Sequence, residues 1–384
     1  MLADMCQGYH SHDTHALPPQ AICDAYKRYQ RMDDAAVSAD LEIIDFTRGL
    51  TEEQDRKLVP VDTIPSELIT VALKAFKVER EEKSAGIPEA CTVYEHYDFP
   101  GTTSFCLSLS PIPVPKVISD KTRGLRLLPS LLPPSCQNAF VSRLLHRDLS
   151  NPLHTTNLHH DYNIPYPPSV DTSFFSYPQS SRDKVFIPKH LHTSHKPLNT
   201  AQFLQKKLRY VTLGSQYDWA TRSYPTSTPT PFPDDISRLV TTLFQNAFKP
   251  ESGVVLLYST KDYMPVHRDV SEECGRGLAS FTLGCDGLFV IAKDKFGDEE
   301  GKDDREQEIV CIRVRSGDVV QMGGETRWAW HAMPKIIGGT CPEEMREWPV
   351  GSLGEGVEEP NEFERWRGYM RTKRLNISCR QVWS

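Results

Sequence analysis

The sequence predicts an α+β fold in which a β-sandwich or jelly-roll core is covered by helices and preceded by a loop-rich N-terminal extension. Three observations support this. After residue 250, short apolar or alternating runs follow one another between Gly, Asp and Ser turns. A strongly amphipathic helical pattern comes just before them, and most of the 29 Pro residues fall before residue 235. We therefore expect the β core near the C-terminus, with helices packed on its outside.

A helix is predicted over residues 234–248, where apolar side chains recur at spacings of three and four. Asp234 or Asp235 is expected to cap its N-terminus. Strands are predicted wherever the runs are rich in Val, Ile, Leu and aromatics. These runs are "LRYVTLG" (208–214), "GVVLLYS" (253–259), "LASFTLG" (278–284), "GLFVIAK" (287–293), "IVCIRVRSGDVVQMGG" (309–324) and "RLNISCRQVW" (374–383).

Composition divides the chain near residue 100. Residues 1–100 hold short helical patterns among polar linkers and are predicted to be a poorly ordered N-terminal extension. Residues 101–384 are predicted to form one domain, whose jelly-roll core spans about 205–384. A hydrophobic content of 39% is enough for a sizeable core, but not for a core that runs through all 384 residues.

Charge and targeting features argue against several classes of protein. The net charge of −7 is not that of a strongly basic nucleic-acid-binding protein, although residues 361–384 are locally positive. The ten Cys residues include no Cys-X-X-Cys pair, and the N-terminus has neither an apolar signal core nor a basic segment. No apolar run approaches the roughly 18 residues of a membrane span. We expect a protein of the nucleus or cytoplasm, with no membrane partner and no stable protein partner.

The tripeptide His-Arg-Asp occurs twice, in "LLHRDLSN" (144–151) and in "PVHRDVSEE" (265–273). In a protein-kinase catalytic loop the Asp is a base, and an Asn five residues further on holds a metal. Here those positions are Leu153 and Cys274, and neither a Gly-rich loop nor an Asp-Phe-Gly stands in the right place. The kinase interpretation therefore fails for both copies.

His-X-Asp is also half of an iron site in which two His and one carboxylate leave three positions open. His267 and Asp269 are two residues apart, so at the end of a strand their side chains share one face. His331, in "TRWAWHAMPKI", is the only His after residue 269 and has a strand context. By elimination within the β region, the predicted iron ligands are His267, Asp269 and His331.

The run "KRLNISCRQ" places three polar residues, Arg374, Asn376 and Arg380, on one face of an otherwise apolar strand. Iron sites of this kind usually hold 2-oxoglutarate through its carboxylates. An Arg suits that role, because its planar guanidinium pairs with a carboxylate through two bonds and stays charged. The alternative is a strand at the surface edge of a sheet.

Together these residues resemble the signature of the AlkB-type iron(II)- and 2-oxoglutarate-dependent dioxygenases, and among them the eukaryotic AlkB homologue 1 branch. Six segments carry the resemblance over about residues 205–384: "LRYVTLGSQYDW", "TPFPDDISRL", "HRDVSEE", "LASFTLG", "SGDVVQMGG" and "RLNISCRQV". The resemblance implies a double-stranded β-helix (jelly-roll) core. It also implies Fe(2+) as the metal, 2-oxoglutarate and O2 as co-substrates, and DNA or RNA as the substrate.

The resemblance assigns roles to individual residues. The iron ligands and catalytic residues would be His267, Asp269 and His331. The residues that bind the co-substrate would be Arg374 and Tyr258, at the distal carboxylate of 2-oxoglutarate, with Asn376 and Arg380 completing the pocket.

Two aromatic residues and one departure complete the comparison with the family. Tyr217 and Trp219 would lie near the substrate, where an aromatic ring stacks on a flipped base, or they pack in the core. Leu256 stands where the family has an Asn, two residues before the Tyr matched by Tyr258. An apolar side chain cannot donate that hydrogen bond, so the departure bears on 2-oxoglutarate affinity.

The activity that the resemblance implies is oxidative demethylation of N-methylated bases in DNA or RNA, tRNA included. Such an enzyme couples the conversion of 2-oxoglutarate to succinate and CO2 to hydroxylation of an N-methyl group, which then leaves as formaldehyde. Two alternatives stay open. One is a 2-oxoglutarate dioxygenase that hydroxylates a protein or a small molecule, and the other is a catalytically weak AlkB-like binding protein, which Leu256 suggests.

Overall fold

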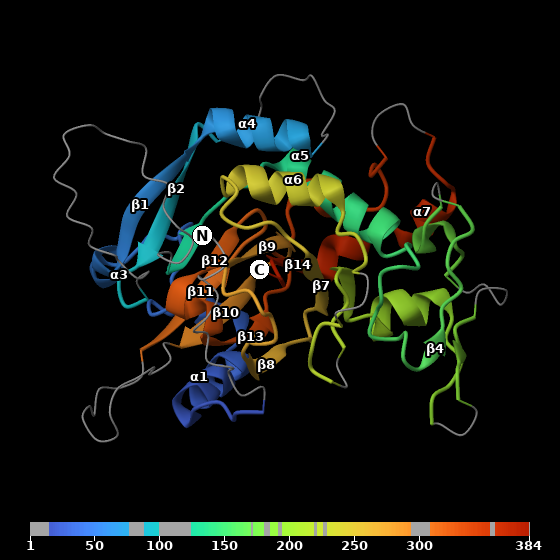
Figure 1. Cartoon of the computed structure of the whole chain (residues 1–384), viewed down its shortest axis with the longest axis horizontal. Coiled ribbons are helices and arrows are strands. Elements are labelled where there is room, and N and C mark those ends of the chain that lie inside the picture. Colours follow the sequence, from blue (N-terminus) through green and yellow to red (C-terminus); the bar gives the residue numbers. More distant parts are fainter. Residues whose placement is uncertain are drawn as a thin grey trace, which may run out of the picture.

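The computed structural model describes residues 15–76, 88–99, 124–169, 172–179, 185–190, 194–218, 221–225, 229–292, 308–353 and 358–383. Within these residues, two antiparallel sheets form the centre of the protein and helices lie on their outer faces (Figure 1). A small third sheet pairs β4 (Tyr162–Asn163) with β5 (Ile187–Pro188). Among the helices described, none has both the length and the apolar character needed to cross a lipid bilayer.

The larger sheet has eight strands in the order β1-β2-β3-β12-β9-β14-β7-β6. In chain order these strands are β1 (Leu58–Pro65), β2 (Ala90–His96), β3 (Leu125–Leu128), β6 (Tyr210–Gly214), β7 (Ser252–Ser259), β9 (Leu278–Gly284), β12 (Val319–Met322) and β14 (Lys373–Arg380). Strand β14 lies between β9 and β7, so the polar residues predicted on it belong to a central strand and not to a sheet edge.

The smaller sheet has four strands in the order β11-β10-β13-β8. They are β8 (Met264–His267), β10 (Gly287–Ala292), β11 (Ile309–Val314) and β13 (Trp330–Ile336). The run predicted at 309–324 is thus two strands in different sheets, joined by a turn at Gly317 with φ of +91°. A Cβ there would lie 2.8 Å from the Leu132 carbonyl oxygen, so both the backbone angle and the close approach favour glycine.

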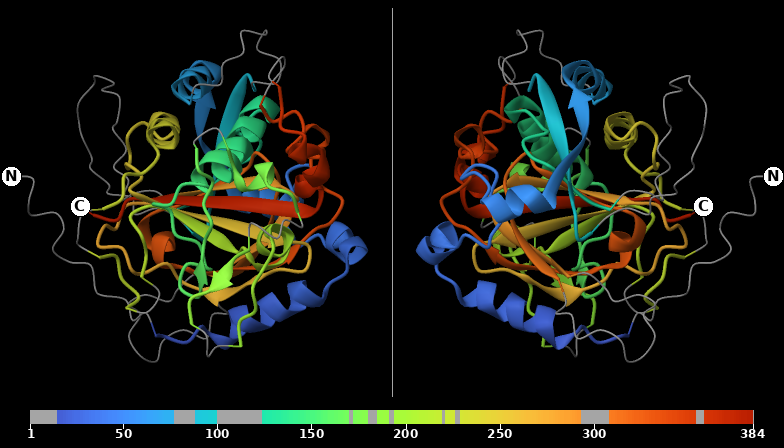
Figure 2. Two further views of the ribbon diagram at one scale, coloured as in Figure 1. Left: turned by 90° about the vertical axis from the view of Figure 1, so that its right-hand side faces the viewer. Right: turned by 90° about the vertical axis from the view of Figure 1, so that its left-hand side faces the viewer.

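Helices cover the outer faces of both sheets, as predicted. They are α1 (Gln20–Arg31), α2 (Asp34–Ala39), α3 (Glu52–Lys57), α4 (Ser66–Ala75), α5 (Pro134–Ser142), α6 (Asp234–Leu243) and α7 (Glu362–Trp366). Helices α4, α5 and α6 lie on the side of the larger sheet, and α1 lies on the opposite side of the molecule against the smaller sheet (Figures 1 and 2). Phe140 of α5 and Phe244, just after α6, each contact Phe281 of β9 through their rings.

The helix predicted at 234–248 is confirmed as α6, which ends at Leu243, but its expected cap is wrong. Pro233 occupies the N-cap position, and no side chain accepts a hydrogen bond there. Asp235 instead pairs with Arg143 and Arg147, which fixes α6 to the segment after α5.

Residues 15–76 and 88–99 lie in the region for which weak order was expected, and they contain helices and strands of the fold. Strands β1 and β2 extend the larger sheet, and α1 buries Ile22 and Tyr29 against the outer face of the smaller one. The apolar residues of this region are sparse, but a helix needs only one stripe of apolar side chains to pack on a preformed sheet. The proposed division of the chain at residue 100 stays a prediction.

Candidate active site

The three predicted iron ligands lie together between the two sheets. His267 is the last residue of β8, and its register partner on β13 is His331, with ring centroids 4.3 Å apart. Asp269 follows two residues after the strand, and one ligand atom from each of the three side chains lies within 4.8 Å of the others. Among the described residues this is the one such group of three. Two imidazoles and one carboxylate are a donor set that suits iron(II) and leaves open positions.

Both imidazole rings are oriented by their own backbone. The Nδ1 of His267 lies 2.9 Å from the Pro265 carbonyl oxygen, and the Nδ1 of His331 lies 2.9 Å from that of Ala329. Since a carbonyl only accepts, each Nδ1 carries the proton and each Nε2 keeps its lone pair for a metal. Burial and the neighbouring His267 lower the pKa of His331 to about 4, which keeps this ring neutral at neutral pH.

Asp269 stays ionised next to these rings. Burial by itself would raise the pKa of this carboxyl, but Arg380, with an Nη2 3.1 Å from Asp269 Oδ2, and then His331 hold it well below its usual value. The site therefore offers one negative charge to a cation.

Arg374 is a buried guanidinium with unused hydrogen-bond donors. It is 1% exposed, and its Nη2 donates to Thr282 Oγ1 at 2.9 Å. Its Nε and Nη1 have no hydrogen-bond partner among the residues that the structure describes, and burial lowers its pKa to about 10. A buried charge with unsatisfied donors is costly unless an anion pairs with it. The arrangement thus fits a bound carboxylate such as that of 2-oxoglutarate.

Neighbouring residues leave room for the Arg374 side chain between the two sheets. Tyr258 of β7 is its register partner, and the guanidinium carbon lies 5.5 Å from the centre of that ring. Burial raises the pKa of Tyr258 to about 12, so its hydroxyl stays protonated and able to donate. A Cβ added to Gly287 of β10 would lie 3.1 Å from Arg374 Nε and 2.7 Å from Met333 Sδ, so the close approach of Arg374 to the smaller sheet depends on glycine.

The other two predicted co-substrate residues are engaged by protein groups. The amide nitrogen of Asn376 donates to Ser280 Oγ at 2.7 Å and to the Phe281 carbonyl at 2.9 Å. Arg380 pairs with Asp269 and, through its Nη1, with Glu272 at 2.8 Å. Leu256, at the position of the missing Asn, is the register partner of Asn376 on β7 and packs partly against the core.

The structure describes one of the two predicted substrate aromatics. Tyr217 is half-buried, with its hydroxyl 3.2 Å from Ser271 Oγ and its ring 5.3 Å from that of Tyr224. Ser271 is two residues beyond Asp269, so the Tyr217 ring lies near the chain segment that carries the carboxylate. Trp219 lies outside the described residues.

Two further charged residues lie beside Asp269 and were not predicted as part of the site. Glu272 and Arg327 form an ion pair of 2.7 Å, with side chains 1% and 0% exposed. Both lie in segments already singled out, "HRDVSEE" and "TRWAWHAMPKI". Charged side chains are usually exposed, and nothing in the spacing of these two predicts that they meet in the interior.

The His-Arg-Asp at residues 146–148 is a structural element. His146 lies on a π-helical turn, Arg143–Asp148, that continues α5. Its ring stacks on Phe363 with centroids 4.9 Å apart, and its two nitrogens contact Ser173 and Ser352 hydroxyls. Burial lowers the pKa of His146 to about 4.

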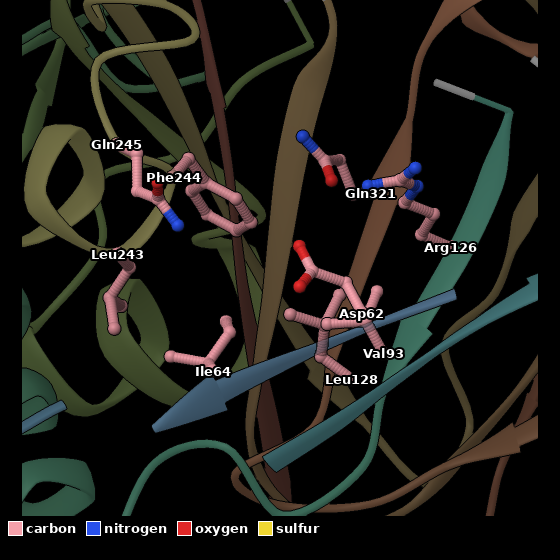
Figure 3. A pocket seen from close by; sticks show the side chains of 9 residues that line it. All are labelled: Asp62, Ile64, Val93, Arg126, Leu128, Leu243, Phe244, Gln245 and Gln321. Atoms are coloured by element: carbon pink, nitrogen blue, oxygen red, sulfur yellow. The ribbon is translucent and has the colours of Figure 1, made fainter. Parts of the chain in front are cut away.

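A small pocket on the other face of the larger sheet does not compete for the role of active site. It lies between the sheet and the end of α6 (Figure 3). Its volume of about 20 Å³ holds one or two water molecules. The residues that line it are Asp62, Ile64, Val93, Arg126, Leu128, Leu243, Phe244, Gln245 and Gln321.

Comparison with known proteins agrees with this geometry. The model of the 2OG-Fe(II) oxygenase superfamily matches residues 124–380. The N6-methyladenosine RNA demethylase ALKB1 of Pyricularia oryzae is 38% identical over 79% of this chain and 88% of its own length. The N6-methyladenosine RNA demethylase ALKBH of Cryphonectria parasitica is 41% identical over 59% of this chain and 99% of its own. The tRNA demethylase abh1 of Schizosaccharomyces pombe is 30% identical over 70% and 82%.

The family match includes all the residues of the site, from Tyr258 to Arg380, and the three relatives extend the similarity to most of the chain. The resemblance noted in the sequence is thereby confirmed. This chain belongs to the 2OG-Fe(II) oxygenase superfamily, as an AlkB-type, 2-oxoglutarate-dependent dioxygenase.

Proposed function

We propose that this dioxygenase removes methyl groups oxidatively from N-methylated bases in nucleic acid, with methylated RNA as the first substrate class to test. The observation that carries the proposal is the combination of the His267, Asp269 and His331 group with the buried, incompletely paired Arg374. Relatives at 38% and 41% identity are named N6-methyladenosine RNA demethylases, and one at 30% a tRNA demethylase, which favours RNA. A relative at 34% identity is named a DNA N(6)-methyladenine demethylase, so methylated DNA should be tested as well.

In this proposal the side chains described above divide the work of binding. His267, Asp269 and His331 hold Fe(2+), while Arg374 and Tyr258 hold the distal carboxylate of 2-oxoglutarate. When bound with oxygen, the metal and the co-substrate supply the oxidising power that hydroxylates the N-methyl group. The chain's own part is to fix both His tautomers, to keep Asp269 ionised and to exclude water from a site enclosed by two sheets.

The fold forms part of the proposal. The smaller sheet carries His267 and His331, and the larger sheet carries Arg374 and Tyr258. We take these two facing sheets as the halves of a double-stranded β-helix, with metal and co-substrate between them. Asn376 and Arg380, on the same face of β14 as Arg374, would then border the pocket through the groups that they bind.

Tyr217 is proposed to contact the base. Its ring is half-buried and its hydroxyl lies next to Ser271, two residues from Asp269, which places an aromatic ring near the proposed metal ligands, where a flipped base would have to enter. Stacking on an aromatic ring is worth roughly 1–3 kcal/mol per base. Replacement of Tyr217 by Ala should therefore raise the KM for a methylated oligonucleotide and leave 2-oxoglutarate binding unchanged.

A panel of oligonucleotides tests the proposal. RNA and DNA strands that each carry one N-methylated base are incubated with Fe(2+), 2-oxoglutarate and oxygen, and the bases are then read by mass spectrometry. We expect loss of the methyl group from at least one methylated strand, and none with Asp269→Ala. If 2-oxoglutarate is turned over but every methylated base stays intact, the substrate is a protein or a small molecule and the proposal is wrong.

A further inference from the structure

The proposed metal ligand Asp269 belongs to a group of four charged side chains, and the other three are buried. Its other members are Glu272, Arg327 and Arg380, whose side chains are 1%, 0% and 8% exposed. Charged side chains are seldom buried this deeply, and when they are, each must be paired and hydrogen-bonded. The group is electrically balanced, with two carboxylates and two guanidinium groups.

Glu272 lies at the centre of the group and joins its two arginines. Its Oε2 accepts a hydrogen bond from Arg327 Nη2 at 2.7 Å, and its Oε1 accepts one from Arg380 Nη1 at 2.8 Å. The Tyr224 hydroxyl donates to Oε1 at 3.3 Å. Burial would raise the pKa of Glu272, but Arg327 and then Arg380 hold it below its usual value, so the carboxylate stays ionised.

The two arginines meet again at Asp269, one at the side chain and one at the main chain. Arg380 Nη2 lies 3.1 Å from Asp269 Oδ2. Arg327 Nη1 donates to the main-chain carbonyl of Asp269 at 2.7 Å, and its Nε donates to that of Arg276 at 3.2 Å. Asp269 lies beyond the end of β8, where no strand hydrogen bonds hold it. The two guanidinium groups therefore take over the positioning that the sheet gives to His267.

The charge on Glu272 also determines how strongly Arg380 pairs with Asp269. With Glu272 ionised, Arg380 divides its donors between two carboxylates, and Asp269 keeps lone pairs for a cation. Without that charge, Arg380 would be left with Asp269 as its one anionic partner within the described part of the chain, and the guanidinium would compete directly with a metal ion for the same carboxylate.

From these contacts we propose that Glu272 is a positioning residue that sets the metal affinity of the site. It acts through Arg380 and Arg327, which hold the side chain and the main chain of Asp269. This inference rests on the proposed metal site, because it assigns the new role to a residue outside the three ligands.

The test compares Glu272→Gln with Asp235→Asn. Each change removes the charge of a buried carboxylate that pairs with two arginines, since Asp235 lies between Arg143 and Arg147 on the other side of the larger sheet. Both variants should lower the urea midpoint of the metal-free protein. A titration with Co(2+) alone, followed by visible absorption, then gives the metal affinity without substrate or turnover.

We expect Glu272→Gln to raise the Co(2+) dissociation constant roughly 10–100-fold, the usual effect of losing an outer partner of a metal ligand. Asp235→Asn should leave it unchanged, and Glu272→Asp, which restores the charge, should recover part of the loss. Equal Co(2+) affinity of Glu272→Gln and wild type would overturn the inference. So would an equal loss in Asp235→Asn, because the effect would then come from stability alone.

Arg327→Lys provides a second route if Glu272→Gln does not fold. A lysine keeps the positive charge, but one ammonium cannot replace the guanidinium fork that spans Glu272, Asp269 and Arg276. We expect weaker Co(2+) binding again, and unchanged binding contradicts the inference. A wild-type protein that binds no Co(2+) would refute the proposed metal site itself, which separates the two failures.

Discussion

His267 and His331 face each other as register partners across β8 and β13, with their rings 4.3 Å apart. Opposed residues of an antiparallel pair point to the same side of the sheet, which brings two remote segments to one point. Each ring is held by a carbonyl two residues earlier in the chain, so the orientation of both follows from the backbone. The metal-binding geometry is therefore a property of the smaller sheet, to which the loop after β8 adds Asp269.

The first prediction separates the two copies of His-Arg-Asp. His267→Ala or Asp269→Ala removes a proposed ligand and should abolish succinate release. His146→Ala or Asp148→Ala removes groups engaged in packing and in an ion pair with Arg147, and should leave turnover per folded molecule intact. Equal loss of turnover in both sets would contradict the assignment of the site.

The second prediction concerns Arg374. Arg374→Met removes charge-assisted hydrogen bonds to the co-substrate, each worth about 1.5–3 kcal/mol, and should raise the KM for 2-oxoglutarate by about 100-fold. The same change removes a buried, partly unpaired charge, so the metal-free protein should lose no stability in urea. Lys373→Met, the neighbouring cation that donates to the Gln205 carbonyl, is the control and should not change this KM. Unaltered 2-oxoglutarate kinetics in Arg374→Met would rule out the proposed clamp.

The third prediction addresses Leu256. It is the register partner of Asn376 and lies on the same face of β7 as Tyr258, so an amide there would reach the co-substrate side of the sheet. Leu256→Asn should lower the KM for 2-oxoglutarate about threefold to tenfold, because one hydrogen bond contributes roughly 0.5–1.5 kcal/mol. Leu256→Ala should give no such gain. An equal or higher KM in Leu256→Asn would show that this position no longer faces the co-substrate.

The fourth prediction is a pH dependence of stability that arises from His146. Burial lowers its pKa in the folded protein to about 4, whereas in the unfolded chain it is about 6.5. Between these values the unfolded state binds more protons, so the free energy of unfolding falls as the pH drops. The loss should reach about 2 kcal/mol between pH 6.5 and pH 5. Urea unfolding of His146→Gln should lack this component, and identical pH profiles would argue against a neutral, buried His146.

Much of the β core and of the site could be predicted because local sequence determines it. Alternating apolar runs between turns are sufficient to locate β7, β9, β10, β11, β12 and β14. The spacing of His267 and Asp269, and the fact that His331 is the only later His, were enough to predict a metal-binding group. The structure brings these three side chains together. The six-residue interval from Arg374 to Arg380 likewise placed both arginines on one face of β14.

The features that could not be predicted depend on contacts between distant segments. The order of α1 comes from the outer face of the smaller sheet, where Ile22 and Tyr29 are buried, and no local pattern reports that partner. Glu272 and Arg327 look like surface charges in the sequence, because ion pairing across 55 residues leaves no periodic signal. The register that sets Leu256 opposite Asn376 is also a product of the assembled sheet.

The most direct test of the account is the ratio of formaldehyde to succinate released with a methylated RNA oligonucleotide. An enzyme that couples 2-oxoglutarate turnover to N-demethylation releases one formaldehyde for each succinate, and the unmethylated strand yields little of either. Asp269→Ala should release neither product. Succinate release that is the same with and without the methyl group, and that yields no formaldehyde, would contradict the proposed function.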